Sequence, residues 1–309
     1  MLGVMSEKAS EFDPRRYPAA WTVPVSMGEA GNWMEHVPFG CALVEALEPA
    51  TVVELGVEYG DSYLAFCQTV AAGGRGGRTK CFAVDTWRGD AHTGNYQEAV
   101  YQTVVAGNAP YAGFSTLMRT TFDEARGSFG DGSVDLLHID GLHTYEAVRQ
   151  DFETWLPKVS SRGVVLFHDT AERSRDFGVW RLWGEVSGRY LSCEFGFGHG
   201  LGVLLVGGEV PVVVKELVGA VRGEAGVAEY FGRLGAGISA MQTARVLAGK
   251  VAVAQDLVNQ WKRLVGASDQ MVGGKSPRED GDRLIQGVHM VASADLQLRQ
   301  DIQKRQGKV

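Results

Sequence analysis

Histidine and aspartate side chains follow two apolar runs within residues 138–170, HIDGLHTYEAVRQDFETWLPKVSSRGVVLFHDT. Asp140 ends the first run, His143 follows three residues later, and His168 and Asp169 end the second run. If both runs are parallel strands, these side chains meet at one edge of a sheet. Asp140, His168 and Asp169 then suit a divalent cation such as Mg2+, which would lower the pKa of a substrate hydroxyl. His143 is placed to take the proton from that hydroxyl.

A second group of carboxylates follows an earlier apolar run, in residues 52–66, VVELGVEYGDSYLAF. Acids and glycines alternate there in an ExGxxxG pattern: Glu54, Gly56, Glu58, Gly60 and Asp61. The glycines permit a tight turn, but the acids disfavour a phosphate and favour a ligand with a cationic or hydroxyl-rich part, such as an aminoacyl group and a ribose. Asp85 ends the next apolar run, about 30 residues after Glu54, where an acid can accept both ribose hydroxyls.

The elements that would position these residues are short, continuous apolar runs, as expected of parallel strands covered on both faces. Five such strands are predicted, at 51–55, 81–85, 115–119, 134–140 and 163–169, with an amphipathic helix at 144–156. Two further strands, at 189–195 and 201–207, would form a pair that closes the sheet antiparallel at its edge. The sequence therefore predicts a doubly wound, Rossmann-like α/β sheet, mostly parallel with an antiparallel edge strand.

Three segments are expected along the chain. Residues 1–40 are predicted to be a loosely structured lead-in, 41–208 the ligand-binding domain and 209–309 a helical extension. A heptad-like apolar seam in the extension joins Leu247, Val251, Ala254, Val258, Trp261 and Val265, and a second helix is expected at about 283–305. The two helices are interpreted as a hairpin through which the chain forms a homo-oligomer, or as helices that pack on the domain.

The composition excludes several classes of protein. The chain has 309 residues and a net charge of −7, which argues against a nucleic-acid partner or an anionic membrane surface. It has no 18-residue apolar run and no secretory signal pattern at residue 1. Its four cysteines lack metal-ligand spacing and are predicted to be free, buried thiols: Cys41, Cys67, Cys81 and Cys193. We therefore expect a cytoplasmic protein.

Two motifs resemble those of class I S-adenosylmethionine-dependent methyltransferases. VVELGVEYGDS is similar to the first motif of that family and FAVDTW to the second, and the resemblance covers roughly residues 41–206. It implies that the first loop wraps the methionine end of the cofactor and that Asp85 holds the ribose. Trp87 would cover the adenine, or else pack in the core. The cofactor-binding residues implied are Glu54, Gly56, Glu58, Gly60, Ser62, Asp85, Thr86, Trp87 and Asp140.

Residues 138–170 further resemble the metal-dependent O-methyltransferases of sugar and antibiotic tailoring, similar to methyltransferase family 24. Asp140, His143 and Asp169 match their pattern, whereas position 168 is usually Glu and here is His. A site with His168 could accept Mg2+ or Mn2+, or it could work without metal with His143 or His168 as base. The resemblance implies methylation of a hydroxyl of a sugar, a glycan or a glycosylated natural product.

The remaining polar candidates have weaker support. The insert 86–113 is interpreted either as a lid that faces a sugar or as a surface helix, with these candidate lid residues: Trp87, Arg88, Asp90, His92 and Tyr96. His138 is predicted to be a core histidine and His199 a turn residue, while His36 and His289 have no informative context. The alternatives are an NAD- or nucleotide-sugar-dependent oxidoreductase and a catalytically inactive methyltransferase-like scaffold. The surplus acids of the first loop argue against the oxidoreductase, and the joint presence of Asp140, His143 and Asp169 argues against the scaffold.

Overall fold

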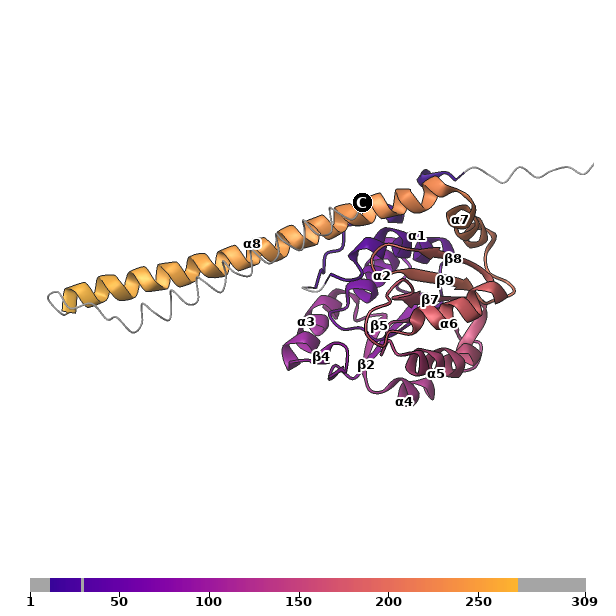
Figure 1. Cartoon of the computed structure of the whole chain (residues 1–309), viewed down its shortest axis with the longest axis horizontal. Helices are drawn as coiled ribbons and strands as arrows, with labels where there is room; N and C mark the ends of the chain where they lie inside the picture. Colours follow the sequence, from indigo (N-terminus) through magenta and orange to yellow (C-terminus); the bar gives the residue numbers. More distant parts are fainter. Residues whose placement is uncertain (1–11, 29–30, 272–309) are drawn as a thin grey trace, which may run out of the picture. The chain divides into compact units, whose positions relative to one another are not determined.

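The computed structural model describes residues 12–28 and 31–271 (Figure 1). The chain divides into two compact units, Met1–Gln242 and Thr243–Val309. The first unit contains the sheet, and helix α8 (Ala225–Met271) begins in it and continues into the second. The second helix expected at about 283–305 lies outside the described residues, so the helical hairpin stays a prediction.

A seven-stranded sheet in the order β5-β2-β1-β6-β7-β9-β8 forms the centre of the first unit. Strand β9 runs antiparallel to both its neighbours, β7 and the edge strand β8, and the other pairings in the sheet are parallel. This arrangement confirms the predicted fold class. The strands are β1 (Thr51–Leu55), β2 (Lys80–Asp85), β5 (Ser115–Arg119), β6 (Val134–Ile139), β7 (Val159–His168), β8 (Leu191–Phe195) and β9 (Leu201–Leu205).

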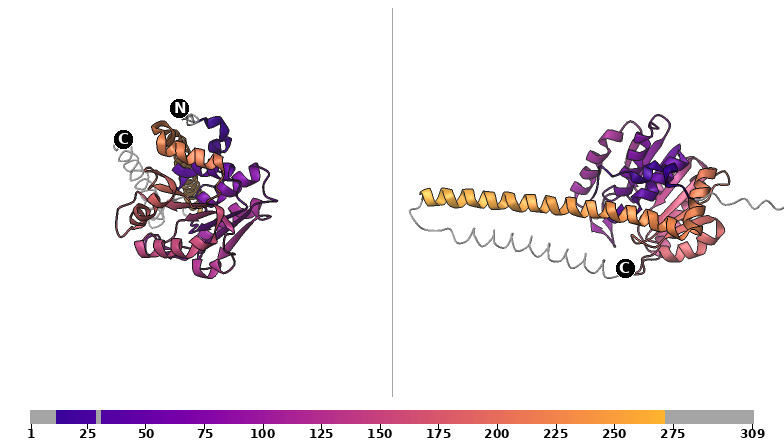
Figure 2. Two further views of the ribbon diagram at one scale, coloured as in Figure 1. Left: turned by 90° about the vertical axis from the view of Figure 1, so that its right-hand side faces the viewer. Right: turned by 90° about the horizontal axis from the view of Figure 1, so that it is seen from above.

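Helices cover both faces of the sheet (Figures 1 and 2). One face is covered by α1 (Val37–Leu47), α2 (Asp61–Ala72) and α7 (Val212–Gly223). The other is covered by α4 (Phe122–Arg126), α5 (Tyr145–Trp155) and α6 (Val179–Val186). Successive side chains along a strand point to opposite faces of the sheet and enter two separate apolar clusters. The strands are therefore continuous apolar runs in the sequence.

Two local features bring the strand ends together. Gly56 has a φ of 85°, and a Cβ at this position would collide with the carbonyl oxygen of Asp140, so the loop after β1 presses directly on the end of β6. Helix α5 begins after Thr144, whose hydroxyl accepts a hydrogen bond from the Ala147 amide at 3.3 Å. This cap ends the loop that carries His143 immediately beyond β6.

The described part of the N-terminal lead-in is more tightly packed than predicted. It forms the 3-10 helices η1 (Pro14–Arg16), η2 (Pro18–Trp21) and η3 (Met34–His36), and both Trp33 and Met34 are buried. Asp61, at the start of α2, accepts a hydrogen bond from the Gly28 amide, and Gln242 of α8 donates to the Gly28 carbonyl at 2.8 Å. Since α7 also packs on α1, the segment predicted to extend from residue 209 begins inside the first unit.

The insert after β2 consists of a short hairpin followed by the surface helix considered for it. Strands β3 (Gly89–Asp90) and β4 (Gly94–Asn95) form a small hairpin, and α3 (Glu98–Asn108) follows as a surface helix that buries Val100 and Val104. The remaining short helices are η4 (Ala109–Tyr111), η5 (Leu156–Lys158) and η6 (Ser187–Arg189).

All four cysteines are free and buried, as predicted. Within residues 12–28 and 31–271, no helix combines the length and apolar character that crossing a membrane requires.

Candidate active site

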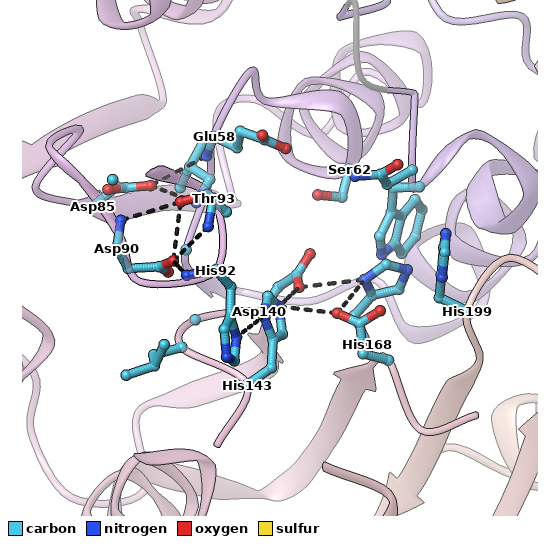
Figure 3. A pocket seen from close by; sticks show the side chains of 18 of the residues that line it. Glu58, Ser62, Asp85, Asp90, His92, Thr93, Asp140, His143, His168 and His199 are labelled. Atoms are coloured by element: carbon cyan, nitrogen blue, oxygen red, sulfur yellow. Dashed lines mark hydrogen bonds and ion pairs between the residues drawn. The ribbon is translucent and has the colours of Figure 1, made fainter. Parts of the chain in front are cut away.

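A cavity of about 600 Å3 opens at the carboxyl ends of β1, β2, β6 and β7 (Figure 3). Both predicted groups of chemistry-bearing residues border it, as the strand-end rule for α/β sheets requires. The predicted site residues that line it are Gly56, Glu58, Ser62, Asp85, Thr86, Asp140, His143, His168 and Asp169. The hairpin of the insert contributes Asp90, His92, Thr93 and Tyr96, and the loop after β7 contributes Glu172, Ser174, Arg175 and Phe177.

Two carboxylates and two imidazoles form a compact cluster in this cavity. His143 Nε2 lies 2.9 Å from Asp169 Oδ2 and 3.5 Å from Asp140 Oδ1. His168 Nδ1 lies 3.3 Å from the same Asp140 oxygen and 3.4 Å from the same Asp169 oxygen. The ligand atoms of Asp140, His143 and Asp169 all lie within 4.8 Å of one another and could hold a metal ion. The predicted juxtaposition is therefore present, but the group of three that could hold a cation contains His143 in the place predicted for His168.

Mutual attraction shifts the proton affinities in the cluster. Burial alone would lower the pKa of His143, but its hydrogen bonds to Asp140 and Asp169 raise that pKa to about 10. The same two carboxylates overcome burial at His168 and raise its pKa well above the usual range. Burial opposes ionisation of Asp140 and Asp169, yet the imidazoles hold the pKa of both carboxyls well below its ordinary value. Without a bound cation, the imidazoles supply the positive charge that the carboxylates require.

His36, a buried histidine that the sequence did not single out, shares a hydrogen-bond acceptor with His168. His168 Nε2 donates to the Gly198 carbonyl at 3.2 Å, and His36 Nε2 donates to the same oxygen at 2.8 Å. Burial lowers the pKa of His36 to about 3, so this imidazole is neutral. His199, predicted to be a turn residue, has a φ of 66° and also lines the cavity, with its Nδ1 3.1 Å from Glu172.

His143 is held on its other side by the insert. Its Nδ1 lies 3.3 Å from Nδ1 of His92, and both rings stack on Phe177 with centroids 4.7 Å apart. His92 Nε2 in turn lies 2.7 Å from a carboxylate oxygen of the exposed Asp176. The hairpin of the insert and the loop after β7 therefore meet beside His143. The lid role considered for His92 stays a prediction.

The loop after β1 is organised by Asp85. One carboxylate oxygen of Asp85 accepts hydrogen bonds from the Val57 and Glu58 amides, at 2.8 and 3.1 Å. The other accepts one from the Trp87 amide at 2.7 Å. Burial and the nearby Asp140 raise the pKa of Glu58 to about 7. Asp85 therefore fixes the loop while its oxygens remain at the cavity wall.

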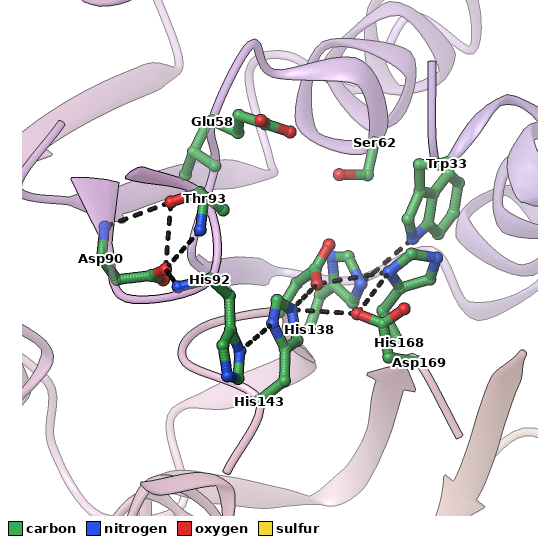
Figure 4. A network of polar contacts seen from close by, with 12 residues as sticks. Trp33, Glu58, Ser62, Asp90, His92, Thr93, His138, His143, His168 and Asp169 are labelled. Carbon is green, nitrogen blue, oxygen red and sulfur yellow. Dashed lines mark hydrogen bonds and ion pairs between the residues drawn. The ribbon is translucent and has the colours of Figure 1, made fainter. Parts of the chain in front are cut away.

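Glu54 is fully buried and belongs to a polar network with Ser62, His138 and Trp33, the three residues of it that Figure 4 labels. It accepts a hydrogen bond from Ser62 Oγ at 2.7 Å, and its other oxygen lies 3.0 Å from Nδ1 of His138. His138 Nε2 accepts from the Trp33 indole at 3.2 Å. Since Ser62 and Trp33 line the cavity and Glu54 does not, Glu54 acts by positioning these two walls. His138 is a core histidine, as predicted.

Trp87 does not occupy the position over the adenine considered for it. Its side chain is 1% exposed, packs on Tyr101 with ring centroids 4.8 Å apart, and donates its indole N–H to the Glu58 carbonyl at 3.0 Å. Its φ of 49° turns the chain inward directly after Asp85. The core-packing alternative is the one that the structure contains.

Comparison with known proteins identifies the central segment. Residues 53–170 match the Methyltransf_24 family model, described as a methyltransferase domain. The uncharacterized protein y4gI of Sinorhizobium fredii (strain NBRC 101917 / NGR234) is 53% identical over 178 residues, which are 58% of this chain. The chain spans only 19% of the length of that relative.

Solved structures with a similar arrangement include O-methyltransferase TomG of Streptomyces achromogenes, involved in tomaymycin synthesis and in complex with S-adenosylmethionine. It is 11% identical, with 63% of this chain and 99% of that chain covered and a TM-score of 0.42. Podospora anserina methyltransferase PaMTH1, bound to S-adenosylhomocysteine, is 12% identical, with 63% and 89% covered and a TM-score of 0.41. Likeness at this level does not extend to substrate or mechanism. The family match and the order of the sheet together identify residues 53–170 as a class I methyltransferase domain.

Proposed function

We propose that this chain transfers the methyl group of S-adenosylmethionine to a hydroxyl of a sugar, a glycan or a glycosylated natural product. The observation that carries the proposal is one cavity bordered by two different groups of residues. The loop after β1 and Asp85 lie on one side of it, and the cluster of Asp140, His143 and Asp169 lies on the other.

The first side of the cavity fits the cofactor. S-adenosylmethionine supplies a methyl group on a positively charged sulfur and carries an ammonium group and ribose hydroxyls. Glu58, Asp85 and Asp140 provide carboxylate acceptors at the wall, and Ser62 and Thr86 provide hydroxyls. Acceptors of this kind pair with hydroxyl and ammonium donors, whereas a dinucleotide would bring its phosphates against the same acids.

The second side of the cavity fits removal of a proton. A sugar hydroxyl is a weak nucleophile at neutral pH, so the chain must align its oxygen with the methyl group and accept its proton. His143 is the proposed base. In that role it must be neutral, so the charge of Asp140 and Asp169 has to be balanced by another group, either His168 or a bound cation.

The same residues fit a divalent cation. Asp140 and Asp169 would hold it through Oδ1 and Oδ2, with imidazole nitrogens beside both oxygens. Such a cation supplies Lewis acidity, which lowers the pKa of a hydroxyl that it contacts. On the acceptor side, the polar groups of Asp90, Thr93 and Tyr96 suit a hydroxyl-rich molecule.

The test of the proposed function is calorimetry followed by turnover. S-adenosylhomocysteine should bind the full chain, and NAD should not. Mass spectrometry of a panel of glycans and glycosylated natural products, incubated with S-adenosylmethionine, should reveal a product heavier by one methyl group. Binding of NAD in place of S-adenosylhomocysteine would contradict the proposal, as would cofactor binding without transfer to any hydroxyl-bearing acceptor.

We also propose that α8 mediates self-association of the chain. Three residues of the seam, Leu247, Val251 and Trp261, are exposed on the described part of this helix. Apolar side chains repeated at heptad-like spacing are typical of helices that pack on one another. A second copy of the chain is the proposed partner.

A further inference from the structure

Imidazole nitrogens flank the two carboxylates of the cluster on both sides. The four atoms alternate as His143 Nε2, Asp140 Oδ1, His168 Nδ1 and Asp169 Oδ2 (Figures 3 and 4). The successive separations are 3.5, 3.3 and 3.4 Å, and 2.9 Å closes the ring. Any ion that contacts both carboxylate oxygens therefore has a nitrogen donor next to it.

These separations match neighbouring ligands around one ion. Metal–nitrogen and metal–oxygen bonds of about 2.1 Å place adjacent ligand atoms about 3.0 Å apart in an octahedron and about 3.4 Å apart in a tetrahedron. The separations of His168 Nδ1 from Asp140 Oδ1 and Asp169 Oδ2, 3.3 and 3.4 Å, fall within that interval. His168 can therefore ligate an ion held by the two carboxylates, while His143 stays the proposed base.

The orientation of His168 is that of a metal-ligating histidine. Its Nε2 donates to the Gly198 carbonyl, which leaves Nδ1 directed at the carboxylates. A ligating histidine typically donates its second ring nitrogen to a carbonyl or carboxylate in this way, which fixes its tautomer. Gly198 has a φ of 55°, and a Cβ there would lie 2.8 Å from His36 Nε2, so the carbonyl is held by close packing.

We propose that the cluster binds a divalent transition-metal ion of the Mn2+ and Zn2+ class in preference to Mg2+, and that His168 sets this preference. The inference rests on the proposed function, whose cation it specifies. Imidazole nitrogen suits transition ions, whereas Mg2+ prefers oxygen ligands and keeps its waters. A glutamate at position 168 would offer oxygen in place of Nδ1 and so would favour Mg2+.

The test uses the full chain after treatment with a chelator and dialysis. Free Mn2+ is followed by electron paramagnetic resonance during a titration, and Mg2+ is then added as competitor. We expect Mn2+ to bind and Mg2+ to compete more weakly by a factor on the order of ten or more. His168→Glu should tighten Mg2+ binding and narrow the difference between the two ions. The matched control is His199→Gln, a cavity histidine outside the four-atom ring, which should change neither affinity.

A second measurement avoids dependence on the variant folding correctly. Pulsed electron paramagnetic resonance of wild-type chain with bound Mn2+ should detect coupling to 14N of histidine. Oxygen-only coordination, equal competition by Mg2+, or an unchanged ion preference in folded His168→Glu would each overturn the inference. Calorimetry with S-adenosylhomocysteine on the same samples separates the two proposals: cofactor binding without Mn2+ binding refutes only the metal site, and loss of both refutes the proposed function as well.

Discussion

Replacing His138 by leucine should show how strongly the buried polar network of Glu54 depends on one neutral imidazole. Glu54 and His138 are both fully buried and lie opposite each other in the register of β1 and β6. The Trp33 indole can only donate, so Nε2 of His138 accepts, and the proton of the neutral ring is on Nδ1, 3.0 Å from Glu54 Oε2. His138→Leu removes both contacts and leaves Glu54 with the hydrogen bond from the Ser62 hydroxyl.

The expected loss is large. Losing an N–H that faces a buried carboxylate costs about 1.5–3 kcal/mol, and leaving the Trp33 donor unsatisfied adds about 1–3 kcal/mol where the protein does not relax. Because the terms overlap, we expect the free energy of unfolding to fall by about 2–5 kcal/mol at pH 8. Urea denaturation followed by circular dichroism measures this value.

The loss should depend on pH in a defined direction. Burial raises the pKa of Glu54, and His138 opposes that shift in the wild type. Without His138 the folded state binds a proton at Glu54 more tightly than the unfolded state does, so stability is lost as the pH rises above about 4.5. The deficit should therefore be smaller at pH 5 than at pH 8. Adding Glu54→Gln, which removes the charge, should abolish this difference and restore part of the stability.

A fall of less than about 1 kcal/mol in the free energy of unfolding of His138→Leu at pH 8 would contradict the role assigned to His138. So would a loss that is the same at both pH values, since an unpaired buried carboxylate must respond to pH.

Four further predictions concern the cavity, the base, a second buried acid and α8. Asp85→Ala should weaken binding of S-adenosylhomocysteine by about 1–3 kcal/mol, measured by calorimetry, and unchanged affinity would contradict its assignment. His143→Ala should reduce turnover about 10²–10⁴-fold with nearly unchanged cofactor affinity, and full activity on a verified acceptor would refute the proposed base. Burial and Asp123 raise the pKa of Asp151 from 3.8 to about 7, so its ionisation destabilises the fold as the pH rises. Asp151→Asn should thus increase the free energy of unfolding by ~2 kcal/mol at pH 8, after allowance for partial exposure, and by almost nothing at pH 4. Val251→Glu with Val258→Glu should lower the mass found by light scattering while Gln255→Glu does not, and a monomeric wild type would show self-association to be wrong.

The juxtaposition of Asp140, His143 and Asp169 could be predicted because it follows from strand ends alone. Each residue ends an apolar run or follows it within three positions, and parallel strands bring such positions to one edge. The strand at 115–119 was likewise predicted with its observed bounds. A local sequence pattern is enough to predict these residues, because ligand sites at the carboxyl ends of strands are common to α/β sheets.

The side chains behind the cluster could not be predicted, because they arrive from distant loops. His92 and Asp176 are separated by 84 residues, and His36 and Gly198 by 162. No periodicity marks such contacts, since loop conformation depends on what the loop packs against. Trp87 illustrates the same limit: its neighbour Asp85 lines the cavity, while a left-handed φ turns Trp87 into the core.

Position 168 shows why a single departure from a family pattern needs support elsewhere in the chain. A carboxylate there would have no N–H to donate to the Gly198 carbonyl, whereas the imidazole donates to it and still presents Nδ1 to Asp140 and Asp169. His36 donates to the same oxygen and lies edge-on to His168 with ring centroids 5.5 Å apart. The residues at 36, 168 and 198 are therefore linked by hydrogen bonds, and exchange of His168 alone removes one donor from the part-buried Gly198 carbonyl as well as one nitrogen from the cluster.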